Sequence, residues 1–143
     1  MRGAAALCAA LALACAVAAG CGGEAGDLML VRRSGSIPDA RLELRFTEDG
    51  RVACNRRPLR ELTSAQTLEV RGLQRDLAGK NGDGPATRRV DLPPGPGAIL
   101  RYRVSMEAGH VAFSDTSRGQ PKTFYEVAQL TRDVARTICH QPR

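Results

Sequence analysis

The histidines are the side chains best suited to proton transfer, and this chain has two of them, His110 and His140. Nucleophilic catalysis needs a serine or cysteine beside a histidine, and acid–base catalysis needs a poised histidine or paired carboxylates. His110 is near Ser114 and Asp115 in the sequence, but the spacing along a strand does not bring them onto one site. His140 lies close to the C-terminus, where fraying opposes fixed geometry. We therefore expect a protein that is not an enzyme and needs no cofactor.

The thiols of Cys54 and Cys139 offer a second kind of chemistry. A metal site built from them and His140 lacks a fourth ligand at any standard spacing, so we expect no metal. In an exported protein, an even pair of cysteines is typical of a disulfide. Closing a loop of about 86 residues would stabilise the fold by roughly 4–5 kcal/mol through loop-closure entropy. We predict a disulfide between Cys54 and Cys139.

Export is indicated by the N-terminal segment. Arg2 provides a basic start, residues 4–19 are apolar, and small residues follow, which is the three-part pattern of a signal peptide. The apolar stretch of about 16 residues is shorter than the roughly 20 that a helix needs to cross a bilayer. This pattern predicts a segment that directs export rather than a retained transmembrane helix.

Residues 18–21, Ala-Ala-Gly-Cys, resemble the lipobox of bacterial lipoproteins, although Ala18 stands where that family usually has leucine. The resemblance implies that residues 1–20 are removed as a signal peptide and that Cys21 is lipidated. Residues 21–26 would then be a flexible tether to the extracytoplasmic face of the cell membrane. Two acyl chains hold a protein on a membrane stably, whereas one does not. The alternative is an ordinary secretory signal, which would leave a secreted protein.

The chain is basic, with 21 Lys and Arg against 15 Asp and Glu and a net charge of +6. Its only lysines are Lys80 and Lys122, so nearly all positive charge is guanidinium, which suits bidentate contacts with carboxylate or phosphate. A GC-rich coding bias is the alternative explanation. Export and the lack of interleaved aromatic residues argue against nucleic acid as a partner. Anionic lipid or an acidic polymer fits better, at about 1 kcal/mol per basic group near a charged surface.

Apolar residues alternate with polar ones in two pairs of segments, which predicts two hairpins. An unbroken apolar run at residues 28–31 predicts a further strand at the sheet centre. The expected strands cover residues 27–33, 41–47, 51–55, 98–106 and 110–114, with a short edge strand around Val90 and Leu92. Capping boxes predict two helices. One, with Thr63 and Gln66 as its capping box, runs from about Ser64 to Leu77. The other has Thr123 and Glu126 as its capping box and runs to about Cys139.

The simplest packing of these elements is an α+β fold in residues 27–143, taken as a single domain. A mostly antiparallel sheet of about five strands would carry both helices on one face. The opposite face would present charged side chains, namely Arg41, Glu43, Arg45, Arg101 and Arg103. The predicted disulfide would join the sheet to the last helix.

The segment Arg-Arg-Ser-Gly-Ser-Ile at residues 32–37, with the element order of residues 27–138, resembles the emfourin proteins. These are small inhibitors of thermolysin-like metalloproteases with an early Ser-Gly-Gly-aromatic turn. Here Ser36 replaces the second glycine and Ile37 the aromatic residue. The resemblance implies that the inhibitory residues would be Ser34, Gly35, Ser36 and Ile37.

Two functions follow from the sequence. The first is a membrane-anchored, non-enzymatic binding module of the cell envelope that uses Arg41, Arg45, Arg101 and Arg103. Its partner would be an envelope protein, an extracellular protease or an anionic polymer. The second is an emfourin-like inhibitor of a thermolysin-type metalloprotease.

Overall fold

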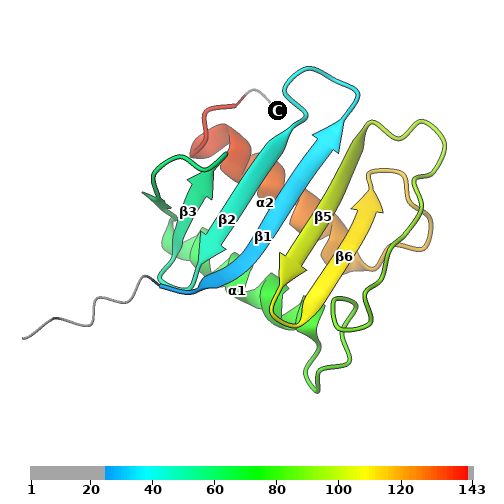
Figure 1. Ribbon diagram of the computed structural model, residues 1–143, viewed down its shortest axis with the longest axis horizontal. Helices are drawn as coiled ribbons and strands as arrows, with labels where there is room; N and C mark the ends of the chain where they lie inside the picture. Colours follow the sequence, from blue (N-terminus) through cyan, green and yellow to red (C-terminus); the bar gives the residue numbers. More distant parts are fainter. Residues whose placement is uncertain (1–24, 142–143) are drawn as a thin grey trace, which may run out of the picture.

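The computed structural model describes residues 25–141, which form one six-stranded sheet and two helices. The strands are β1 (Asp27–Gly35), β2 (Leu42–Thr47), β3 (Arg51–Cys54), β4 (Arg60–Glu61), β5 (Leu100–Met106) and β6 (Gly109–Ser114). The helices are α1 (Ser64–Ala78) and α2 (Lys122–Thr137). The strand order is β4-β3-β2-β1-β5-β6, and every neighbouring pair is antiparallel. Both helices lie against one face, as Figure 1 shows, which confirms the predicted α+β architecture.

The sheet has six strands rather than the expected five or so. The additional strand is β4, whose two exposed residues pair with β3. Around Val90 and Leu92 there is no regular strand but a single parallel bridge from Asp91 to Ala112 on β6. The proline- and glycine-rich sequence on both sides of this bridge explains why it does not extend, because proline removes a donor from the ladder.

The core lies between the sheet and the helices. The register places Val31 of β1 between Leu44 of β2 and Val104 of β5, and all three are buried. Few aromatic residues are available, and three of them stack in series. The ring centroids of Tyr102 and Phe113 are 5.2 Å apart, and those of Phe113 and Phe124 are 4.6 Å apart. This stack joins the sheet to α2.

The two helices begin in different ways. Thr63 and Gln66 form the predicted capping box of α1, in which the Thr63 hydroxyl accepts from the Gln66 backbone at 3.2 Å. The predicted capping box at Thr123 and Glu126 is wrong, because α2 already begins at Lys122 after Pro121. Glu126 instead pairs with the Lys122 ammonium at 2.7 Å, one turn earlier on the same helix.

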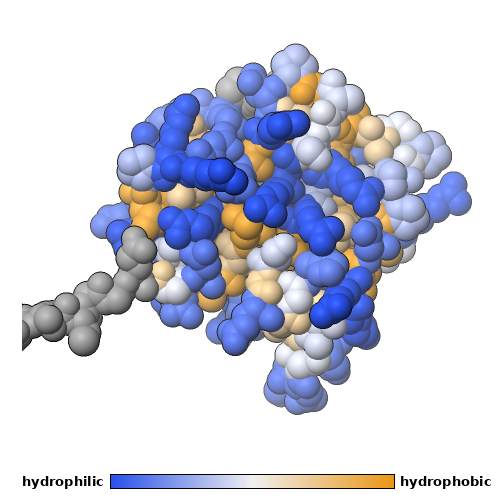
Figure 2. All heavy atoms as spheres, in the orientation of Figure 1, coloured by the Kyte–Doolittle hydropathy of each residue, from blue (hydrophilic) through white to orange (hydrophobic). Residues whose placement is uncertain are grey.

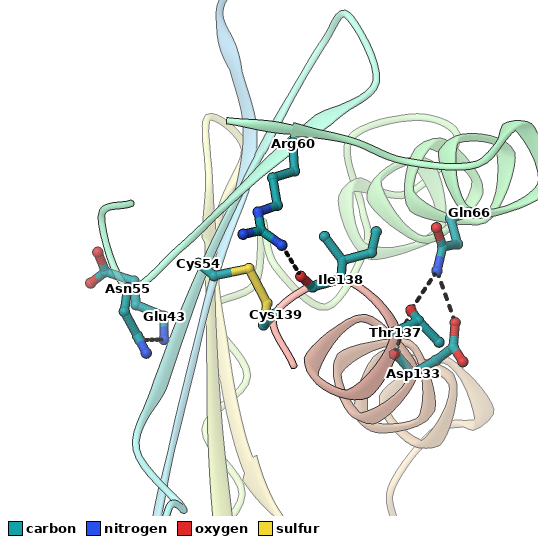
Figure 3. The surroundings of a disulfide bond; sticks show 9 residues. All are labelled: Glu43, Cys54, Asn55, Arg60, Gln66, Asp133, Thr137, Ile138 and Cys139. Atoms are coloured by element: carbon teal, nitrogen blue, oxygen red, sulfur yellow. Dashed lines mark hydrogen bonds between the residues drawn. A yellow bond between two sulfur atoms is a disulfide. The ribbon is translucent and has the colours of Figure 1, made fainter. Parts of the chain in front are cut away.

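The disulfide between Cys54 and Cys139 is present, with the two Cα atoms 5.8 Å apart (Figure 3). It joins the end of β3 to the residue that follows α2 and its cap, Ile138. The helix ends at Thr137 rather than near Cys139 as predicted. The Cys139 N–H donates to the Val134 carbonyl, five residues back, and so departs from the four-residue spacing of an α-helix. Arg60 reinforces the junction by donating to the Ile138 carbonyl at 2.9 Å.

Candidate functional site

The face of the sheet that the helices leave uncovered carries a cluster of arginines. We call this surface the arginine face, and it comprises Arg32, Arg41, Arg45, Arg56, Arg101 and Arg103. All of them except Arg45 line a shallow depression of about 730 Å³. Figure 2 shows hydrophilic side chains gathered over the middle of this face. The predicted surface residues are therefore brought together.

Strand pairing determines which charges are neighbours. Arg32 of β1 lies opposite Glu43 of β2 on one side and opposite Arg103 of β5 on the other. Residues directly opposite each other on antiparallel strands have Cβ atoms about 4.5–5.5 Å apart, and like charges there repel. The register therefore places two arginines, Arg32 and Arg103, side by side, and Arg32 directs its guanidinium to Glu43 on the other side.

Three carboxylates partly neutralise the face. Glu43 accepts a hydrogen bond from Arg32 at 2.9 Å and lies 3.5 Å from the Arg56 guanidinium. The hydrogen bond from Arg32 is the main cause that holds the pKa of Glu43 below its ordinary value, despite some desolvation. Arg45 pairs with Asp27 at 3.1 Å, and Arg101 pairs with Asp91 at 3.0 Å.

Two arginines of the face have no such partner. Within residues 25–141, Arg41 and Arg103 are exposed and form no ion pair or side-chain hydrogen bond. The six named guanidinium groups therefore have three carboxylate partners, Glu43, Asp27 and Asp91. A guanidinium without a partner can contact a carboxylate or phosphate through two parallel hydrogen bonds. An anion with two oxygen acceptors is the kind of group that these two side chains could hold.

The four residues implied by the emfourin resemblance also lie together. Ser34 and Gly35 end β1, and Ser36 and Ile37 continue into the loop to β2. The Ser36 N–H donates to the Ile99 carbonyl at 3.1 Å, which joins this loop to the segment before β5. Ile37 is 41% exposed.

A buried arginine that sequence reasoning did not single out holds this loop. Arg33 points into the core, and its guanidinium donates to the Ala40 carbonyl at 2.9 Å and the Asp39 carbonyl at 3.0 Å. Burial lowers the pKa of Arg33 below its ordinary value, and nearby Tyr102 acts in the opposite direction. Met29, Val31 and Arg33 are two residues apart, so a strand places them on one side, but the unbroken apolar run at residues 28–31 does not indicate that this side faces the core.

Sequence reasoning also missed Arg32 and Arg56. Arg32 lies within the strand expected at residues 27–33, but only the register, which sets it opposite Glu43, places it on this face. Arg56 follows a reversal in which Asn55 and Arg56 adopt φ values of 50° and 63°. Such left-handed conformations are favoured locally only by glycine and, less strongly, asparagine or aspartate, so no local pattern predicts the position of Arg56.

The residues considered for catalysis are kept apart. His110 is the second residue of β6 and lies on the same side as Ser114, but four residue steps along the strand place them about 13 Å apart. The Ser114 hydroxyl lies 3.0 Å from that of Ser117, and Asp115 accepts from two backbone N–H groups. His140 is exposed after α2. Among the described residues, no group of three or more His, Cys, Asp and Glu could hold a metal ion.

The predicted signal peptide and Cys21 lie outside the described residues, so lipidation stays a prediction. In residues 25–141, no helix has the length and apolar character that crossing a bilayer requires.

Comparison with known proteins returns no match, whether among family models, curated proteins or solved structures. The resemblances to lipoproteins and emfourins therefore remain predictions that depend on the residues named above.

Proposed function

We propose that this protein is a tethered, non-enzymatic binding module of the cell envelope that holds an anionic partner on its arginine face. The observation that carries the proposal is the excess of guanidinium groups over carboxylates, with Arg41 and Arg103 exposed and without partners in residues 25–141. A purely solvated surface needs no such clustering, because interspersed charges of both signs serve solubility well.

The proposal includes attachment through a lipid on Cys21. Fractionation of cells tests this part: the wild-type protein should sediment with membranes, and Cys21→Ala should be released. Retention of the variant on membranes would count against lipidation.

Binding at the arginine face is tested with inorganic polyphosphate as a soluble probe and the mature protein as cells process it. Each of Arg41→Gln and Arg103→Gln should weaken binding about fivefold, since a basic group near a charged surface contributes about 1 kcal/mol. Arg75→Gln is the matched control, because Arg75 is an exposed arginine on α1, in the helix layer. Equal losses in all three variants would show that binding depends on net charge rather than on this face.

A second function is favoured by the loop at residues 34–38. It projects an exposed Ile37, while Arg33 and the bond from Ser36 to Ile99 hold its backbone in place. Rigid exposed loops bind with little loss of entropy, which suits an emfourin-like inhibitor. Such an inhibitor should slow thermolysin stoichiometrically and lose potency in Ile37→Asp. An unaffected protease would exclude this function.

A further inference from the structure

Two of the exposed large apolar residues belong to segments that meet at one end of the sheet. Among the described residues, Ile37 is 41% exposed and Ile99 is 47% exposed. The hydrogen bond from Ser36 to the Ile99 carbonyl joins their two segments. Single exposed apolar residues are ordinary on a protein surface, but here Ile99 is two residues before Arg101, and Ile37 is in the loop that leads to Arg41.

The loop that contains Ile37 lies at the opposite end of the sheet from the residue at which β1 begins (Figure 1). The chain enters the sheet at Asp27, and β1 carries it over nine residues to Gly35, a distance of about 30 Å. Figure 1 shows the start of β1 and the β1–β2 loop at opposite ends of the sheet. A tether before Asp27 and an apolar contact at Ile37 would therefore hold the sheet at both ends, with the arginine face between them.

We infer that the anionic partner is the phospholipid surface of the membrane, with Ile37 and Ile99 entering its interfacial region. This inference rests on the proposed function, because it assigns a partner to the same arginine face. Phosphate headgroups match the guanidinium groups of Arg41 and Arg103. The apolar side chains then reach the boundary between headgroups and acyl chains, about 5–10 Å deep. A soluble anionic polymer would contact the arginines but would leave both isoleucines in water.

The chain contains no tryptophan, so Ile37→Trp introduces a single fluorescent reporter at the proposed contact. The mature protein carrying this change is mixed with vesicles of phosphatidylcholine alone, or of phosphatidylcholine with phosphatidylglycerol. We expect blue-shifted emission, and quenching by brominated acyl chains, only when phosphatidylglycerol is present. Adding Arg41→Gln and Arg103→Gln should weaken this response about 25-fold.

Leu68→Trp is the matched control, because Leu68 is 69% exposed on α1, in the helix layer. Its emission should be the same with both vesicles. Ile99→Trp provides a second reporter at the proposed contact, which keeps the test valid if Ile37→Trp does not fold.

The outcomes separate the two proposals. If both isoleucine reporters emit identically with the two vesicles while polyphosphate still binds, the arginine face holds a soluble anion and the membrane inference is wrong. A Leu68→Trp shift as large as theirs would also overturn it, since the contact would not be specific to this edge. If the folded protein binds neither polyphosphate nor phosphatidylglycerol vesicles, both proposals are wrong.

Discussion

Replacing Glu43 with glutamine should strengthen anion binding, although the change removes two ion pairs. Glu43 accepts from Arg32 at 2.9 Å and lies 3.5 Å from Arg56, so it neutralises part of the arginine face. Glutamine keeps the size of the side chain and removes its charge, leaving both guanidinium groups available to a ligand. The loss of one negative charge beside the ligand is comparable to the gain of one basic group, about 1 kcal/mol or fivefold in affinity.

The cost in stability should be small. Ion pairs exposed to solvent contribute about 0–1 kcal/mol, and the backbone bond from Glu43 N–H to the Asn55 side chain, at 2.8 Å, does not depend on the charge. The assay is calorimetric titration with polyphosphate at pH 7 and constant salt, together with a urea melt. Glu107→Gln is the control, because Glu107 is exposed in the turn between β5 and β6. Unchanged or weaker binding by folded Glu43→Gln would refute the reasoning.

The pH dependence has a definite sign. The bond from Arg32 lowers the pKa of folded Glu43 below its unfolded value, which is about 4.3. The ion pairs therefore stabilise the fold fully above that value, and this contribution is lost as pH falls through the lower folded pKa. Protonation also frees Arg32 and Arg56, so wild-type affinity should rise over the same interval. Glu43→Gln should show a smaller rise, because only Asp27 and Asp91 then remain as carboxylate partners of the arginine face.

Three further substitutions test the scaffold by urea denaturation. Cys54→Ser should lower the free energy of unfolding by about 2–5 kcal/mol under oxidising conditions; a loss that is equally large in reducing buffer would contradict a role for the disulfide. Phe124→Ala empties one end of the aromatic stack and should cost about 3–5 kcal/mol, so a loss below 1 kcal/mol would argue against this packing. Gly35→Ala places a Cβ atom 2.2 Å from the Ile99 carbonyl oxygen and should cost about 1–3 kcal/mol; a neutral effect would show that the loop shifts freely.

Local patterns were sufficient for most of the secondary structure. The alternation in β2, β5 and β6 depends only on the two-residue period of a strand, so it can be recognised in the sequence without knowing which strands pair. The capping box of α1 is also local, since Thr63 and Gln66 are three residues apart. The disulfide was predictable because the expected export signal, with residues 1–20 removed and Cys21 lipidated, would leave two thiols to pair.

Elements stabilised by distant contacts were harder to predict. The two residues of β4 are too few to show an alternating pattern. They form a strand through their pairing with Arg51 and Val52 of β3. Arg33 was unexpected in the core, because a buried guanidinium is favourable only where the fold supplies acceptors. Those acceptors, the carbonyls of Asp39 and Ala40, belong to a loop whose shape the sequence does not reveal.

The sequence by itself determined that Arg45, Arg101 and Arg103 share the side of their strands opposite the apolar residues, because side chains alternate along a strand. Only the tertiary structure decided that β1 lies between β2 and β5, which places Arg32 between Glu43 and Arg103. Pairing between strands distant in the chain depends on the free energy of the whole sheet and its core. The grouping of charges into one face, and the sharing of Glu43 by two arginines, follow from that global balance.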